Sequence, residues 1–167
     1  MILGISIPTF TLLHVIISLI AIVSGLAATW DLLRARPVSA WTGVFLTTTV
    51  ATSVTGFFFP SKFGPPQVIG VLSLVLLGAA IYALAGRHMA GRWRAAYIIT
   101  AIAALYLNVF VGVVQAFQKI APLHLLAPTQ SEPPFAIVQG LVLIGFLLAG
   151  WVALRRHPPA RVQTGIL

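Results

Sequence analysis

The segment at residues 105–119 (LYLNVFVGVVQAFQK) carries the most regular set of polar side chains in a sequence that is 59% hydrophobic and 7% charged. Its polar and small positions recur at intervals of four, three and four residues, which places them on one face of an α-helix: Asn108, Gly112, Gln115 and Lys119. Amides and an ammonium group on one face can hydrogen-bond a ligand, another helix or enclosed water. This stripe is the first candidate for a functional site.

Polar side chains from other segments are expected at the same depth. Counting about 1.5 Å per residue from the end of each apolar segment places four of them roughly 6–9 Å below one membrane surface, namely His14, Thr55, Gln115 and Gln139. Three more fall deeper, namely Ser18, Thr52 and Asn108. The connection at residues 119–134 would cover this layer with Lys119, His124, Gln130 and Glu132. We expect either an outward-facing binding site for a small or lipophilic ligand, or hydrogen bonds that only join helices, because an unpaired polar group in hydrocarbon is costly.

His14 is the histidine inside a predicted membrane span, so it is the candidate for redox or proton chemistry. It could ligate haem or hydrogen-bond a quinone carbonyl. Haem in a helix bundle commonly needs a second axial ligand, and on this side that ligand would have to be His124. We therefore expect no cofactor, with haem or a quinone as less favoured alternatives.

Acidic residues are too few for hydrolytic or phosphoryl-transfer chemistry. The chain has Asp31 and Glu132 on opposite predicted sides, so it cannot pair carboxylates or build a Ser–His–Asp set. The absence of cysteine excludes thiolate metal sites and iron–sulfur clusters. We predict no catalytic residue, no metal ligand and a non-enzymatic protein.

The elements that would position these residues are five apolar segments of the length that crosses a bilayer, about 20 residues each. The predicted fold is all-α, a single polytopic transmembrane helix bundle with spans at residues 9–30, 40–59, 67–85, 95–117 and 135–154, followed by a cytoplasmic tail at 155–167. In the first span, small residues recur every three or four positions, which lets another helix approach closely: Ser18, Ala21, Gly25 and Ala28.

The ten basic residues predict the orientation. With five spans, eight arginines fall on one side: Arg34, Arg36, Arg87, Arg92, Arg94, Arg155, Arg156 and Arg161. Lys62 and Lys119 fall on the other. The positive-inside rule then predicts an outer N-terminus and a cytoplasmic C-terminus. Because the cations flank spans, the net charge of +8 indicates contact with membrane lipids and no nucleic-acid partner.

Three segments resemble those of small uncharacterised bacterial inner-membrane proteins: TSVTGFFFP at 52–60, LNVFVGVVQAF at 107–117 and APTQSEPPF at 127–135. The resemblance implies a five-span protein of the bacterial inner membrane and no activity. Since the composition excludes most chemistry and supplies much packing surface, we expect an accessory or assembly subunit that packs against a membrane-protein partner or a second copy of itself. The alternatives are an outward-facing ligand-binding or transport protein and, less favoured, a haem-binding electron-transfer subunit.

Overall fold

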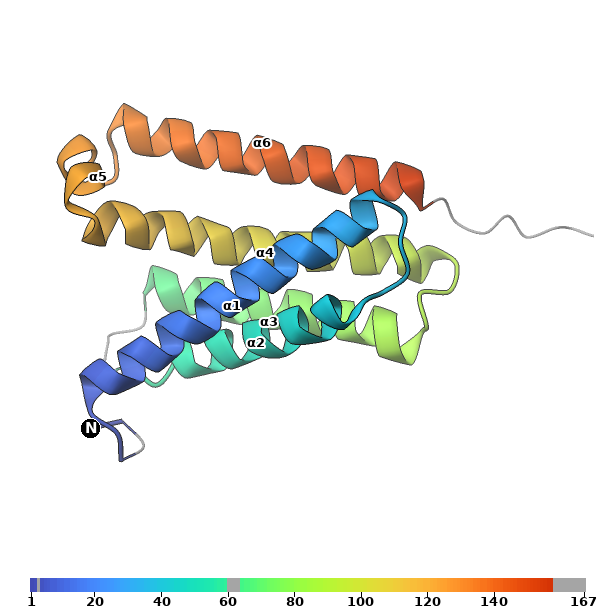
Figure 1. The fold of residues 1–167 in the computed structure, drawn as a ribbon, viewed down its shortest axis with the longest axis horizontal. Helices are drawn as coiled ribbons and strands as arrows, with labels where there is room; N and C mark the ends of the chain where they lie inside the picture. Colours follow the sequence, from blue (N-terminus) through green and yellow to red (C-terminus); the bar gives the residue numbers. More distant parts are fainter. Residues whose placement is uncertain (3, 60–63, 158–167) are drawn as a thin grey trace, which may run out of the picture.

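The computed structural model describes residues 1–2, 4–59 and 64–157, and every regular element in them is a helix (Figure 1). The elements in chain order are α1 (Ile7–Leu33), α2 (Ala40–Gly56), α3 (Pro65–Ile81), a π-helical turn η1 (Tyr82–Gly86), α4 (Arg92–Lys119), α5 (Ala121–Leu126) and α6 (Pro133–Arg156). The all-α prediction is confirmed for these residues. Lys62, Arg161 and most of the predicted tail lie outside the described residues.

Four helical stretches are long and apolar enough to cross a membrane, namely α1, α3 together with η1, α4 and α6. This finding indicates an integral membrane protein. The remaining long helix, α2, has 17 residues and is rich in threonine. It packs against both α1 and α3, and in Figure 1 it runs alongside them.

The predicted start of the second span coincides with the start of α2 at Ala40, and the other predicted boundaries differ from the helix ends by two to four residues. Helices α3 and α6 begin two residues early because each has proline in its first turn, where the missing N–H costs nothing. Helix α2 ends at Gly56, earlier than predicted, because the N–H groups of Phe57 and Phe58 turn back to carbonyls only three residues earlier. The connection at residues 119–134 contains the short helix α5.

The end of α1 lies beyond the predicted position because Asp31, Leu32 and Leu33 continue the helix. Two hydrogen bonds then close it: Ala35 N–H donates to the Leu32 carbonyl at 3.1 Å and Arg36 N–H donates to the Asp31 carbonyl at 2.9 Å. This is the Schellman pattern, which places Ala35 in the left-handed region at φ 53°. Glycine is the usual residue there, so alanine carries backbone strain.

Helix α4 is the centre of the bundle. In Figure 1 it runs between α6 on one side and the group of α1, α2 and α3 on the other. The largest fully buried apolar side chains come from α3 and α4: Leu77, Tyr97, Ile98 and Leu105. The polar stripe predicted at residues 105–119 therefore lies on the most central helix.

The predicted small-residue surface of α1 is where this helix crosses α2 and α4. Ala21, Gly25 and Ala28 are all buried. A methyl group added at Gly25 would stand 2.7 Å from Phe45 Cδ2 of α2 and would also overlap Leu105 Cδ1 of α4. Only glycine lets the three helices meet at this point.

Candidate functional site

His14 and Thr55 join the N-terminal half of α1 to the C-terminal end of α2. His14 Nδ1 lies 2.8 Å from Thr55 Oγ1, and the Thr55 hydroxyl is also 2.7 Å from the Ala51 carbonyl. Because a carbonyl can only accept, the Thr55 proton is used there, and His14 Nδ1–H is the donor to Thr55. The neutral ring then has its lone pair on Nε2. Phe59 packs edge-on against the imidazole, with ring centres 5.2 Å apart.

One turn deeper, Ser18 and Thr52 form a second link between the same helices. Their hydroxyl oxygens are 3.3 Å apart. Ser18 donates to the His14 carbonyl at 2.7 Å, so Thr52 is the donor between the two side chains. The structure therefore brings together, in two pairs, four of the residues that the depth count selected.

Asn108 links α4 to α2 through a residue that the depth count did not select. Its Nδ2 donates to Thr49 Oγ1 at 3.0 Å, and Thr49 is fully buried. The run of threonines in α2 was visible in the sequence, but only the angle between α2 and α4 determines which of them faces Asn108.

Two amides bond to backbone carbonyls of α4. Gln139 of α6 donates to the Phe110 carbonyl at 3.2 Å, and Gln130 of the connection donates to the Val114 carbonyl at 3.3 Å. The Gln139 Oε1 is buried and has no partner among the described residues. These acceptors could not be read from side-chain types, because any residue offers a carbonyl.

Gln115 is the residue of the predicted layer that is exposed on the surface of the bundle. Its neighbours on the stripe are covered: Asn108 by Thr49, and Gly112 by Ile22, whose Cδ1 lies 3.4 Å from the position of an added methyl. Gln115 and Lys119 are exposed, and within the described residues no hydrogen bond of the Gln115 amide is found. In Figure 1 the N-terminal end of α1 and the C-terminal end of α4 lie apart after the helices cross.

Hydrogen bonds to Glu132 organise the connection at residues 119–134. The Glu132 carboxylate accepts from Thr129 N at 3.1 Å, Thr129 Oγ1 at 2.9 Å and Ser131 N at 3.1 Å. Desolvation is the largest single influence and raises the carboxyl pKa, but these hydrogen bonds together outweigh it, so the pKa lies below its ordinary value. The ion pair found in the described part of the chain is Arg36–Asp31 at 3.5 Å, far from this loop.

The two histidines considered for haem have different surroundings, since His14 hydrogen-bonds Thr55 and His124 lies on α5. His124 is exposed on α5, and among residues 1–2, 4–59 and 64–157 no group of three or more His, Asp or Glu side chains could hold a metal ion. His14 presents a lone pair on Nε2, which suits a hydrogen bond from a ligand as well as it suits a metal.

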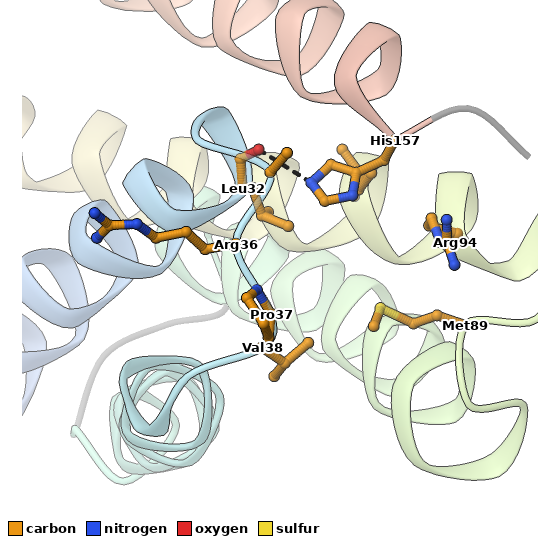
Figure 2. A pocket seen from close by; sticks show the side chains of 9 residues that line it. Leu32, Arg36, Pro37, Val38, Met89, Arg94 and His157 are labelled. Carbon is orange, nitrogen blue, oxygen red and sulfur yellow. Dashed lines mark hydrogen bonds between the residues drawn. The ribbon is translucent and has the colours of Figure 1, made fainter.

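The arrangement as a whole links helices. His14, Ser18, Asn108, Gln130 and Gln139 each bond across to another segment. Two cavities were found in the described residues. One is lined by Leu19, Ile20, Val23, Ser24 and Trp41, and the other, drawn in Figure 2, lies at the end of the bundle opposite to His14 and Gln115. Neither cavity is lined by a residue of the predicted layer.

Comparison with known proteins gives no relative. No protein-family model matches the chain, and neither a curated protein nor a solved structure shows significant similarity to it.

Proposed function

We propose that the protein is a non-enzymatic accessory subunit of the inner membrane that binds a partner membrane protein through its helices. The observation that carries the proposal is the exposed Gln115 amide on α4. An unpaired amide facing hydrocarbon costs on the order of several kcal/mol. A transmembrane helix of the partner that carries a hydrogen-bonding side chain would bond to the Gln115 amide and remove this cost.

The surroundings of Gln115 limit where a partner helix can contact α4. Gly112, one turn below on the same face, is covered by Ile22 of α1, so the partner helix would contact the stripe at the exposed Gln115 and Lys119. By contrast, the middle turns of α3 and α6 expose aliphatic side chains, including Val75 at 63% and Leu147 at 64% exposure. Lipid tails satisfy such faces, so they give no preference for a protein partner.

The proposal includes five spans with an outer N-terminus. Helix α2, with 17 residues, is about 25 Å long, close to the thickness of a hydrocarbon core. It packs against α1 and α3, both of which are long and apolar enough to cross the membrane. A crossing α2 places the arginine-rich connections together on the cytoplasmic side.

A comparison of two glutamine variants tests the proposal. We expect the wild-type protein and the control Gln118→Leu, whose side chain is also exposed on α4, to migrate as a complex larger than a monomer in mild detergent. Gln115→Leu should migrate as the monomer while keeping its helical content. If the wild-type protein is a monomer both in mild detergent and in lipid bilayers, the proposal fails.

The second candidate function is outward-facing binding of a small lipophilic ligand such as a quinone. It is favoured by one observation, the buried Gln139 Oε1 that has no donor among the described residues. Extraction and mass spectrometry of lipophilic compounds bound to the purified protein test it. A compound retained by the wild-type protein and lost from both His14→Ala and Gln139→Leu would support it, and wild-type protein without any such compound would exclude it.

A further inference from the structure

The short helix α5 lies in the connection between α4 and α6, both of which are long and apolar enough to cross a membrane. In Figure 1 it lies beyond the ends of these two helices and runs across their direction. Helix α6 has 24 residues and α4 has 28, which gives lengths of about 36 and 42 Å. These lengths exceed a hydrocarbon core of about 30 Å and match a bilayer with its headgroups, so α5 lies at headgroup level, parallel to the membrane.

The exposed face of α5 is apolar. Leu125 is 80% exposed and Leu126 is 56% exposed. At about 100° per residue, the exposed Ala121 and Pro122 fall on the same continuous arc as these two leucines. Leu123, which is only partly exposed, falls on the other side of the helix. Helix α5 therefore turns its hydrocarbon outward, away from the bundle.

The level of these leucines distinguishes them from exposed leucines in the middle of α6, which face lipid tails. Leu125 and Leu126 follow Lys119, the charged residue in the last turn of α4. They precede the loop in which Thr129 donates hydrogen bonds to the Glu132 carboxylate. Ammonium and carboxylate groups remain in water or among headgroups. Leucines at this level would face water unless they enter the bilayer from its surface.

A lipid surface fits this apolar face better than a protein does. A protein interface of standard size buries about 800 Å² on each side and involves about 20–30 residues, whereas α5 has six residues. The bilayer that surrounds α4 and α6 is continuous with the position of α5, and it removes apolar surface from water without a partner. We propose that α5 is an interfacial membrane anchor whose Leu125 and Leu126 side chains insert between the acyl chains of the leaflet at this end of the bundle.

The anchor has a consequence for the polar stripe of α4. Gln115 precedes the end of this helix at Lys119 by four residues, which is about 6 Å along the helix axis. With α5 held at the level of the headgroups, the Gln115 amide is kept inside the hydrocarbon. Insertion of α5 needs no protein partner, so the purified protein in lipid vesicles is sufficient to test it.

Spin-label accessibility in phosphatidylcholine vesicles tests the proposal, and the chain suits this method because it contains no native cysteine. Leu125→Cys and Leu126→Cys in the full-length chain would place a nitroxide on the apolar arc. The matched control Pro128→Cys is exposed in the same connection, outside α5. Leu147→Cys, at a position 64% exposed in the middle of α6, serves as the reference for lipid contact. Oxygen concentrates in hydrocarbon and a nickel chelate stays in water, so the ratio of their collision rates reports depth.

We expect the oxygen-to-nickel ratio at positions 125 and 126 to lie above the ratio at position 128 and below that at position 147. A ratio equal to that at position 128 would place the leucines in water and overturn the proposal. Low collision rates with both reagents would show that protein covers α5, which would overturn it as well.

The same measurement in a Gln115→Leu background separates the anchor from self-association through Gln115. The ratio at position 125 should be unchanged in this background. A fall to the ratio of position 128 would show that a second copy of the chain had covered α5, and it would overturn the proposal.

Discussion

Gly25→Ala should be among the most damaging single-methyl changes in the bundle. The new methyl group would lie 2.7 Å from Phe45 Cδ2, well inside van der Waals contact, and would also overlap Leu105. Neither neighbour can swing into lipid, because Phe45 is 2% exposed and Leu105 is 0% exposed. The helices must therefore separate or adopt strained rotamers, which costs about 1–3 kcal/mol.

The bundle contains a matched control for this change. Gly43 of α2 has no atom within 4 Å of an added methyl, so Gly43→Ala meets no steric obstacle. Alanine is preferred over glycine inside a helix by roughly 0.5–1 kcal/mol, and Gly43→Ala should therefore be neutral or stabilising. The same helix preference acts at Gly25 and makes any net loss there a measure of the clash.

Equilibrium unfolding in mixed micelles, followed by loss of helical circular dichroism, would measure both variants against the wild type. We expect Gly25→Ala to lower the free energy of unfolding by about 1–2 kcal/mol after the helix preference is subtracted. If Gly25→Ala is as stable as Gly43→Ala, the close crossing of α1, α2 and α4 at this glycine is refuted.

Three further changes test other parts of the structure. Ala35→Gly should stabilise the protein by up to about 1 kcal/mol, because glycine adopts the left-handed conformation without strain; a loss of stability would contradict the helix ending described for α1. Glu132→Gln should destabilise the connection at neutral pH and lose its effect in acid. A carboxyl whose pKa is lowered in the folded protein stabilises the fold above its ordinary pKa and stops doing so as the pH falls through the lowered value. Melting curves against pH check this, and a difference between variant and wild type that persists in acid would refute it. A double-mutant cycle with Asn108→Leu and Thr49→Val should give a coupling of about 0.6 kcal/mol, and a coupling of zero would argue against their hydrogen bond.

The helices could be predicted from the sequence because hydrophobic length and flanking charge determine them. Apolar runs gave the approximate position of each long helix, and the spacing of Ala21, Gly25 and Ala28 indicated which face of α1 is buried. The end of α1 was placed too early, since its final turn depends on hydrogen bonds of Ala35 and Arg36 that no residue type announces.

The candidate site could be predicted only in part, because counting residues gives the depth of a side chain in the membrane but not the direction in which it points. Counting residues placed His14 at the height of Thr55, and the two do hydrogen-bond. The same count placed Gln115 in that layer, but the divergence of α1 and α4 leaves it open. Whether residues at equal depth meet depends on helix rotation and crossing angle, which the sequence does not give.

The cavity at the end of the bundle opposite to Gln115 could not be predicted either, because the sequence does not show which residues of different helices meet. Its arginines, Arg36 and Arg94, were interpreted as determinants of orientation, which requires only that they lie on one side of the membrane. His157 lines the same cavity because α6 ends against the last carbonyls of α1. Residues that are 125 positions apart in the chain thereby share one wall.

Photocrosslinking in intact membranes tests the proposed partner interface most directly. A benzophenone amino acid in place of Gln115 would lie on the open end of the α4 stripe, and the same probe in place of Leu148, which is 57% exposed on α6, would face lipid. The proposal predicts a discrete protein adduct from position 115, with another protein or with a second copy of this chain, and none from position 148. Irradiated samples without a protein adduct at position 115 would contradict it.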